Sequence, residues 1–521
     1  LLTLIFSFLL FNFNVNLMGD DAAYIKRAYK LIENGTFPSF QGPIYPIILS
    51  FFIWIFGLNT VLLKSLSFVF IAGHLYFFYK AFQNRTPSVV YMVVIIIIAT
   101  NAYLLNYASW TFTEALFLMF QALVFYYFFN KIIDINFSSS REKFLKYLVF
   151  GLLLFLLAKT RSIGYGALGA FILFFLFSKK YKDIAYTLGS FGIFYFAFKG
   201  IKSLFFNTAS NHQFGSQFER LMLVDPYNPE KGKESFMGFI ERFWENSELY
   251  ISKHLYKFLG LKADVTQTST LLTIITFILF GLALYYAYRK NKYLFFTGIY
   301  VAVMSGITFI ILQTRWDQER LILVFFPLIL LFILSGIYYL GQEKRNVLLK
   351  TVFPVLIVVL FLTNIGQTFK KVEAHQDEFI HHLKGDDLYG LSPDWVNYVN
   401  MTRYAAEHVP DSVMIACRKP SIAFIKAKRE FHGIYRIPTK DSDKLLRKLK
   451  ENNVKYVIMA SLRKYPNKKT KYTINTVKRY LYYIQQKYPR AIQPVHKIGE
   501  DEEAYLFRVN YSVMNTSSKK Q

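Results

Sequence analysis

Between its first two apolar segments the chain contains the stretch Gly19-Asp20-Asp21-Ala22-Ala23-Tyr24-Ile25-Lys26-Arg27-Ala28-Tyr29. The two adjacent carboxylates directly follow the apolar run 1–17, so they are expected where a membrane helix emerges into water. An acidic side chain at the bilayer centre raises the free energy of membrane insertion by about 2.5 to 3.5 kcal/mol, and it is unfavourable even at the membrane boundary. The apolar residues that follow recur at helical spacing. This predicts a short helix lying along the membrane surface, with both carboxylates at its N-terminus.

The composition is that of a multi-span membrane protein, since 54% of the 521 residues are hydrophobic and 19% are aromatic. In a soluble protein the net charge of +27 would suggest a nucleic-acid partner. Here much of the excess lies in short loops beside apolar runs, and the rest lies in a basic C-terminal region, so we expect no nucleic acid. The single cysteine, Cys417, excludes an intrachain disulfide.

Apolar runs long enough to cross about 30 Å of hydrocarbon predict about eleven membrane spans. They lie at 1–17, 59–79, 88–106, 112–130, 144–160, 163–178, 183–199, 269–288, 293–312, 320–340 and 349–369. The run 43–58 is short and proline-marked at its start, which favours a re-entrant or interfacial segment. No small-residue cleavage site follows the first run, which favours a retained helix over a signal peptide.

Lysine and arginine are distributed unequally between alternate loops of this arrangement. One set of loops is rich in both, whereas the opposite short loops carry few beyond those of the first loop. Positive charge marks the cytoplasmic side of the plasma (inner) membrane. The first loop (18–58), the second large loop (200–268) and everything after residue 370 are therefore expected on the extracytoplasmic side.

The second large loop contains apolar residues at helical spacing between Phe236 and Leu259, with charged residues between them. This predicts an amphipathic helix. Two placements are open for it, one on the outer membrane surface and one against a soluble domain.

From about residue 371 the hydrophobicity falls and the pattern becomes α/β. We predict a small extracytoplasmic α/β domain over 371–510, following a transmembrane domain over 1–370, and a disordered tail over 511–521. The predicted strands lie at 412–416, 454–459 and 504–509, and the predicted helices at 421–428, 441–451 and 474–488.

The first loop resembles that of the GT-C superfamily of membrane glycosyltransferases, in particular the branch with protein O-mannosyltransferases and lipid A aminoarabinose transferases. The resemblance rests on Asp20-Asp21 with the helical spacing after it, and on the later turn Gly42-Pro43-Ile44-Tyr45-Pro46. The family's acidic pair is usually Asp-Glu, so this chain departs at the second position. Three shorter stretches are also similar, Trp110 to Phe117, Lys159 to Ser162 and Gln313 to Arg320.

The resemblance implies a polytopic α-helical GT-C fold that moves a sugar from a polyprenyl-phosphate-linked donor to a lipid, glycan or protein acceptor. Such a transfer needs a carboxylate to accept the acceptor's proton and cations to neutralise the departing phosphate. Asp20 is the expected general base, and Asp21 and Glu114 are expected to orient the acceptor or sugar. The expected phosphate ligands are Arg161, Arg315, Arg320 and Lys159.

We expect no cofactor and no metal site. Superfamily members with diphosphate-linked oligosaccharide donors tend to use a divalent metal, whereas those with single-phosphate carriers tend not to, so metal dependence stays an alternative. The remaining partners are membrane lipids.

Each of these residues also has a purely structural interpretation. The acid pair can cap a helix, and Glu114 can start one. Lys159, Arg161 and Arg315 can contact lipid head groups, and Arg320 can pair locally. Two other functions are also open, namely a flippase or transporter of lipid-linked sugars, and a polysaccharide polymerase or ligase. Charges gathered at one membrane face favour the transferase over a transporter.

Overall fold

The computed structural model describes residues 1–39, 42–206, 217–226, 229–261, 267–344, 347–463 and 473–514. The chain forms two compact units. Unit 1 comprises Leu1–Asn12 and Arg27–Phe379, and unit 2 comprises Phe13–Lys26 and Ile380–Gln521. Two of the three boundaries fall inside helices, namely α2 (Asp20–Asn34) and α18 (Val347–Leu383). Sequence patterns place a single boundary near residue 370, whereas in the structure a short N-terminal segment also belongs to the C-terminal unit.

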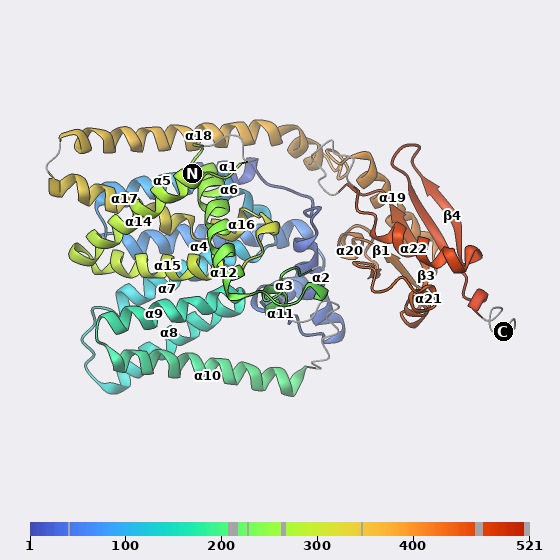
Figure 1. Ribbon diagram of the computed structural model, residues 1–521, viewed down its shortest axis with the longest axis horizontal. Coiled ribbons are helices and arrows are strands. Elements are labelled where there is room, and N and C mark those ends of the chain that lie inside the picture. Colours follow the sequence, from blue (N-terminus) through green and yellow to red (C-terminus); the bar gives the residue numbers. More distant parts are fainter. Residues whose placement is uncertain are drawn as a thin grey trace. The chain divides into compact units, whose positions relative to one another are not determined.

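The long helices of unit 1 run roughly parallel to one another (Figure 1). Beside parts of α2 and α18 its helices are α1 Leu2–Leu9, α3 Ile44–Phe56, α4 Thr60–Phe82, α5 Ser88–Thr100, α6 Ala102–Asn106, η1 Tyr107–Ser109, α7 Thr113–Lys131, α8 Ser140–Thr160, η2 Ser162–Gly164, α9 Tyr165–Phe177, α10 Tyr181–Phe205, α11 Gln217–Leu221, η3 Pro229–Lys231, α12 Phe236–Ser247, the π-helix η4 Glu248–Leu255, α13 Tyr256–Phe258, α14 Thr270–Lys290, α15 Lys292–Ile311, η5 Thr314–Trp316, α16 Arg320–Leu323 and α17 Phe326–Lys344.

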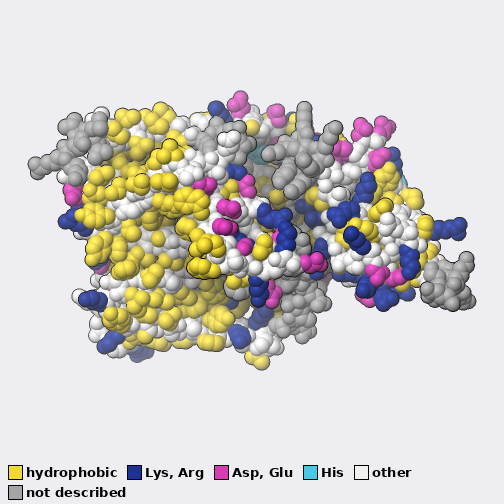
Figure 2. All heavy atoms as spheres, in the orientation of Figure 1, with side chains coloured by type: hydrophobic (Ala, Val, Ile, Leu, Met, Phe, Trp, Pro, Cys, Tyr) yellow, Lys and Arg dark blue, Asp and Glu magenta, His cyan; other side chains and the backbone are white. Residues whose placement is uncertain are grey.

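Among the described residues, six helices are long and apolar enough to cross a membrane: α4, α10, α14, α15, α17 and α18. The pair α5–α6, bent by 44°, would make a seventh. Unit 1 is therefore a multi-pass membrane domain, but the predicted count of eleven spans is not confirmed. Figure 2 shows the broad hydrophobic surface of these helices, with charged side chains gathered near their ends.

The first predicted span illustrates the difference in count. Its run 1–17 is helical only over α1, which has 8 residues and a length of about 12 Å. Asn12, Asn14 and Asn16 interrupt the apolar run, and asparagine is a poor helix former. The chain from Phe13 onward joins unit 2 instead.

Aromatic rings fill the interior of unit 1. Phe296 of α15 lies 4.8 Å from Phe128 of α7 and 4.7 Å from Phe171 of α9, measured between ring centroids. All three rings are buried. Such ring pairs contribute roughly 0.5 to 1.5 kcal/mol beyond the area they bury. The high aromatic content thus serves to hold helices together inside the bundle.

Unit 2 contains a five-stranded sheet of order β2-β1-β3-β5-β4. β1 pairs in parallel with β2 and β3, whereas β5 pairs antiparallel with β3 and β4. This confirms the expected small C-terminal α/β domain. Its elements are α19 Pro393–His408, β1 Met414–Cys417, α20 Pro420–Ala427, β2 Phe431–Gly433, α21 Ser442–Glu451, β3 Val454–Ala460, α22 Thr476–Lys487, η6 Pro489–Ala491, β4 Ile492–Ile498 and β5 Ala504–Val509. Most of the predicted tail, 515–521, lies outside the described residues.

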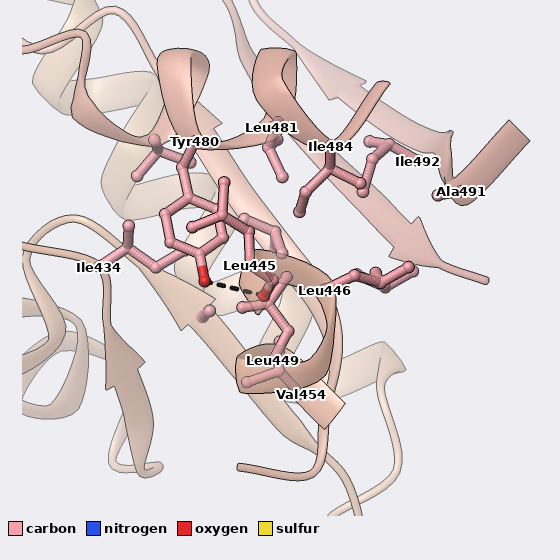
Figure 3. Close-up of a cluster of buried hydrophobic side chains, with 14 of the residues drawn as sticks. Ile434, Leu445, Leu446, Leu449, Val454, Tyr480, Leu481, Ile484, Ala491 and Ile492 are labelled. Atoms are coloured by element: carbon pink, nitrogen blue, oxygen red, sulfur yellow. Dashed lines mark hydrogen bonds between the residues drawn. The ribbon is translucent and has the colours of Figure 1, made fainter. Parts of the chain in front are cut away.

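Helices α21 and α22 cover a buried apolar cluster on this sheet (Figure 3). The Asp441 side chain accepts hydrogen bonds from the amides of Asp443 and Lys444, which starts α21. Leucines of α21 then pack against Val454 and against α22. The Tyr480 hydroxyl donates to the Leu445 carbonyl at 3.0 Å, so the buried phenol is satisfied.

Candidate active site

Glu114 is the centre of a buried ion cluster in unit 1. It lies in the first turn of α7 and is 1% exposed. Its Oε1 atom is 2.6 Å from Nη1 of Arg161 and 3.9 Å from Nε of Arg320. Both guanidinium side chains are largely buried as well, at 15% and 19% exposure. A carboxylate at this depth needs such partners, because desolvation of an unpaired charge costs several kcal/mol.

Arg161 directly follows the C-terminal end of α8, which fixes its position. The helix stops at Thr160, and Arg161 itself is extended, with φ −147° and ψ 140°. Gly42 of the first loop lies directly against this end, because a Cβ atom on Gly42 would come 2.2 Å from the Thr160 carbonyl oxygen. Gly42 also has a φ of +90°, a backbone region that favours glycine. The turn quoted for the family resemblance therefore packs on the helix end that carries Arg161.

The same turn is joined to the start of α7. The hydroxyl of Tyr45, which is fully buried, lies 3.1 Å from the Ser67 hydroxyl of α4. Ser67 in turn donates to the Trp110 carbonyl at 2.6 Å. One turn earlier on α4, Lys64 is fully buried, with its ammonium 4.5 Å from the centre of the Trp110 ring. These contacts join the first-loop turn and α4 to Trp110, which lies just before α7 and Glu114.

Arg320 begins α16, and hydrogen bonds and ion pairs hold the loop before it. Asp317 pairs with His254 at 2.8 Å and with Lys253 at 2.5 Å. The hydrogen bond from His254, followed by that from Lys253, lowers the pKa of Asp317 to about 2 against the effect of its partial burial. Glu319 pairs with Lys257 at 2.5 Å. The π-helix η4 and α13 thereby fix the position of the Arg320 loop.

Further cations lie beside this loop. The Lys371 ammonium is 3.4 Å from the centre of the Tyr103 ring, and that of Lys257 is 5.1 Å from the same centre. Electrostatic interactions link Lys371 with Glu319, and link Tyr107 with Glu114, Arg161 and Arg320. Among the described residues that these contacts join, the cations are Arg161, Arg320, Lys257 and Lys371, and the carboxylates are Glu114 and Glu319. This part of unit 1 is therefore rich in positive charge.

Two of the predicted phosphate ligands lie elsewhere in unit 1. The Lys159 ammonium lies over the rings of Phe155, Tyr165, Tyr195 and Phe198, at 4.9 to 5.9 Å from their centres. Arg315 is half exposed and pairs with Asp225 at 2.5 Å. The structure thus groups Arg161 and Arg320 around Glu114 and gives Lys159 and Arg315 other partners.

Asp20 and Asp21 belong to unit 2. The Asp21 side chain is fully buried, and its carboxylate accepts hydrogen bonds from the Asn16 and Ala22 amides at 2.8 to 3.0 Å. These bonds close the turn before α2. Asp20 is partly exposed and lies within electrostatic range of Lys419. Asp21 is thus fully buried and bonded to backbone amides, whereas part of the Asp20 side chain remains exposed.

Lysines of unit 2 hold this turn. The Lys419 ammonium donates to the carbonyls of Leu17 and Met18 at 3.1 Å each. The Lys426 ammonium donates to the Asn14 side chain at 2.7 Å and pairs with Asp387 at 2.7 Å. The segment that carries the acid pair is therefore fastened to α20 and its flanks.

The arrangement of elements resembles that of solved membrane enzymes. ArnT from Cupriavidus metallidurans, solved with undecaprenyl phosphate bound, aligns over 98% of this chain and 97% of its own, with a TM-score of 0.54 and 10% identity. The archaeal oligosaccharyltransferase AglB from Archaeoglobus fulgidus, solved with an inhibitory peptide and a dolichol-phosphate, aligns over 97% of this chain and 73% of its own, with a TM-score of 0.50 and 12% identity. The chain has the GT-C fold.

The GT-C resemblance inferred from the first loop is thereby confirmed at the level of fold. No family model matches the chain, and no curated protein matches it in sequence. At 10 to 12% identity only the fold carries over from these structures. Among the described residues, no group of three or more His, Cys, Asp or Glu side chains is arranged to hold a metal ion.

Sequence patterns did not single out Lys64, Lys257, Lys371 or Tyr107. Lys64 had a usable signal, since a lone lysine inside an apolar run must either find a partner or reach the surface. Lys371 lies just beyond the last predicted span, where a flanking lysine is common. Lys257 and Tyr107 had no comparable signal, because their relevance depends on which helix ends meet.

Proposed function

We propose that this protein transfers a sugar from a polyprenyl-phosphate-linked donor to an acceptor on the extracytoplasmic side of the membrane, with Asp20 as general base. The observation that carries the proposal is the buried Glu114 between Arg161 and Arg320 on a GT-C fold. The similar structures of ArnT and AglB contain undecaprenyl phosphate and dolichol-phosphate. A lipid-borne phosphate fits the excess of positive charge around Glu114.

The reaction removes a proton from the acceptor hydroxyl and leaves negative charge on the carrier phosphate. The acceptor hydroxyl oxygen forms a bond to the anomeric carbon of the sugar while the bond from that carbon to the phosphate oxygen breaks. The electron pair of the broken bond remains on the carrier phosphate, and the hydroxyl proton passes to the Asp20 carboxylate. Arg161 and Arg320 bind the phosphate oxygens and stabilise the charge that develops there.

Glu114 has a separate role in this scheme. Without donor, its carboxylate partly neutralises the two guanidinium groups that otherwise would be buried together. With donor bound, it keeps both groups oriented while they bind phosphate. Asp21 contributes indirectly, because its carboxylate closes the turn that presents Asp20. The sidedness rests on the charge distribution of the loops, which assigns unit 2 and the first loop to the extracytoplasmic face of the plasma (inner) membrane.

The test is mass spectrometry of envelope lipids and glycans from a deletion strain complemented with variants. We expect the deletion to remove one sugar from a lipid, glycan or protein and to accumulate the polyprenyl-phosphate-linked donor. Wild type and the control Arg289→Met, whose exposed side chain donates a hydrogen bond to the Tyr285 hydroxyl, should restore the product. Arg320→Met and Asp20→Asn should not restore it.

An experiment with the purified protein distinguishes sugar transfer from transport of the donor lipid. Incubated with the donor lipid and an envelope acceptor fraction, a transferase releases free polyprenyl phosphate in proportion to glycosylated product. A flippase would move the intact donor across vesicles and release none. Normal product formation by Asp20→Asn would reject the assignment of the base.

A further inference from the structure

Helix α12 buries polar side chains and exposes apolar ones. Arg242, Asn246 and Ser247 are 5% exposed or less. The exposed apolar residues are Phe236 at 82%, Met237 at 61%, Ile240 at 48% and Trp244 at 40%. This is the reverse of a helix on a soluble domain, which turns its apolar stripe inward.

The buried polar contacts fix the rotation of α12. Arg242 donates to the carbonyls of Leu221 and Leu223 at 2.9 and 2.6 Å and pairs with Glu234 at 2.5 Å. Asn246 donates to the carbonyls of Phe309 and Leu312 at 2.8 Å each. Turning the apolar stripe inward would break these buried hydrogen bonds, which costs about 1 to 3 kcal/mol for each group left unsatisfied. The apolar face therefore stays outward.

The exposed apolar side chains of α12 form a stripe with charged residues along one side. At about 100° per residue its four apolar side chains fall within an arc of about 100°. Glu241 and Glu245 lie in the next sector and are also exposed. An apolar arc bordered by charged groups is the pattern of helices that lie in the surface of a bilayer.

The stripe is continuous with a lipid-facing surface. Phe243 of α12 stacks on Phe277 of α14, with ring centroids 6.4 Å apart. α14 is a candidate membrane span, and it exposes Leu271 at 67% and Ile278 at 57%. Just after α12, Glu248 accepts a hydrogen bond from Thr270, the first residue of α14. In Figure 1, α12 and the helical turns after it run across the direction of α14 and α15.

We propose that α12 is an interfacial membrane anchor, with Phe236, Met237, Ile240 and Trp244 inserted among the lipids of the extracytoplasmic leaflet and Glu241 and Glu245 facing water. The docking itself does not depend on the proposed catalytic function. The occupant of this face is phospholipid, because the apolar stripe continues onto a span that must contact lipid.

The anchor is joined to the loop that leads to Arg320. Asn246 bonds the Leu312 carbonyl, and the Glu245 carboxylate accepts from the Thr314 hydroxyl at 3.0 Å. Gln313 donates to the Leu223 carbonyl, which Arg242 also bonds. Insertion of α12 would therefore set the depth at which this loop lies. In the proposed function, the carrier phosphate lies at the same head-group level.

The test is spin labelling of single cysteines in protein reconstituted into phosphatidylglycerol and phosphatidylethanolamine vesicles. Met237→Cys and Ile240→Cys report the apolar stripe, and Glu241→Cys and Glu245→Cys are the matched controls on the same helix. Cys417→Ala supplies the background. If that variant does not fold, the wild-type background replaces it, because Cys417 is fully buried and its thiol is protected from the label.

We expect labels at 237 and 240 to collide with oxygen several-fold more often than with a water-soluble nickel chelate. Labels at 241 and 245 should show the reverse ratio. Free access of the nickel chelate to all four positions would show that the stripe faces water and overturn the proposal. Poor access of both reagents at 237 and 240 would show that protein covers the stripe, and would equally overturn it.

Discussion

At the scale of single residues, Glu114 determines whether two guanidinium groups can be buried side by side. Its carboxylate is within 2.6 Å of Arg161 and 3.9 Å of Arg320, at an exposure of 1%. Removing one member of a buried ion pair usually costs about 3 to 5 kcal/mol, because the other charge is left without its partner. Removing both members costs less than the sum of the two separate losses.

A double-mutant cycle on Glu114→Gln and Arg161→Gln should therefore be non-additive. We expect each single variant to lower the midpoint of thermal unfolding in detergent. The double variant should lose less than the sum, with a coupling of about 1 to 3 kcal/mol. As a control, Glu114→Gln combined with Lys292→Gln, an exposed pair member of Asp134, should be additive. Additivity in the first cycle would show that the pair does not interact in the folded protein.

The sequence predicted part of this residue-scale site. Glu114, Arg161 and Arg320 could be selected because each lies beside the end of an apolar run in a stretch similar to the GT-C family. The same reasoning selected Lys159 and Arg315, whose side chains take aromatic and acidic partners instead. Proximity to a helix end does not fix the direction of a side chain. Only the packing of neighbouring helices separates the two groups.

At the scale of elements, the site depends on a glycine turn against the end of α8. An alanine Cβ at position 42 would come 2.2 Å from the Thr160 carbonyl oxygen. Gly57 offers a comparison, because its φ of +68° is also positive but no atom lies within 4 Å of its Cβ position. Both alanine variants bear the strain of a positive φ, roughly 1 kcal/mol or more. Only the variant at position 42 adds a clash.

We expect Gly42→Ala to reduce sugar transfer at least tenfold, because the turn must move away from the helix end that places Arg161. Gly57→Ala should retain most of its transfer activity while losing a similar amount of stability from backbone strain. Initial rates of product formation and thermal midpoints in detergent measure the two effects. Equal activity of the two variants would contradict a role for this close approach.

A second feature at the scale of elements is the pair Lys419 and Lys426, which hold the turn before α2. Burial, with a contribution from Arg418, lowers the pKa of Lys419 to about 8 from its ordinary 10.5, while Asp20 acts in the opposite direction. Between these two values the unfolded chain binds more protons at this site than the folded chain. The free energy of unfolding contributed by Lys419 therefore rises as pH increases through this window.

Lys419→Met should remove that pH dependence. We expect the thermal midpoint of wild type, relative to Lys419→Met, to increase between pH 8 and 10. The exposed Lys450→Met serves as control and should track wild type across the same range. A difference between wild type and Lys419→Met that stays constant over this range would show that Lys419 does not titrate there.

At the scale of the whole molecule, the C-terminal α/β unit is discontinuous in sequence, because it includes Phe13–Lys26. The Lys26 ammonium pairs with Glu430 at 2.8 Å, across about 400 residues of chain. Cys417 is buried in the same unit, and burial raises the pKa of its thiol to about 11. Labelling of this thiol therefore reports opening of the unit.

Charge reversal should test whether the N-terminal segment belongs to this unit. We expect Lys26→Glu and Glu430→Lys each to accelerate maleimide labelling of Cys417 several-fold, since each places like charges together. The double variant should restore slow labelling. Labelling that is unchanged in all three variants would indicate that Phe13–Lys26 is not part of the folded unit.

Sequence patterns were most informative where periodicity was strong. In unit 2 the helix 441–451 and the strands 454–459 and 504–509 lie within a residue or so of α21, β3 and β5. The short strand β2 and the strand β4 carried no clear alternation and were not predicted. In unit 1 hydropathy located the helices but not their number of crossings, because an apolar run looks the same whether it crosses lipid, bends or packs inside a bundle.

The central claim is that Arg161 and Arg320, held by Glu114, bind the phosphate of a polyprenyl carrier. Titration of the purified protein with undecaprenyl phosphate, followed by native mass spectrometry, tests it most directly. We expect Arg161→Met and Arg320→Met to bind this lipid roughly 10- to 150-fold more weakly than wild type, the loss expected for a charge-assisted contact of about 1.5 to 3 kcal/mol. Arg289→Met should bind as wild type does. Equal binding by all four proteins would show that Arg161 and Arg320 do not hold the carrier phosphate.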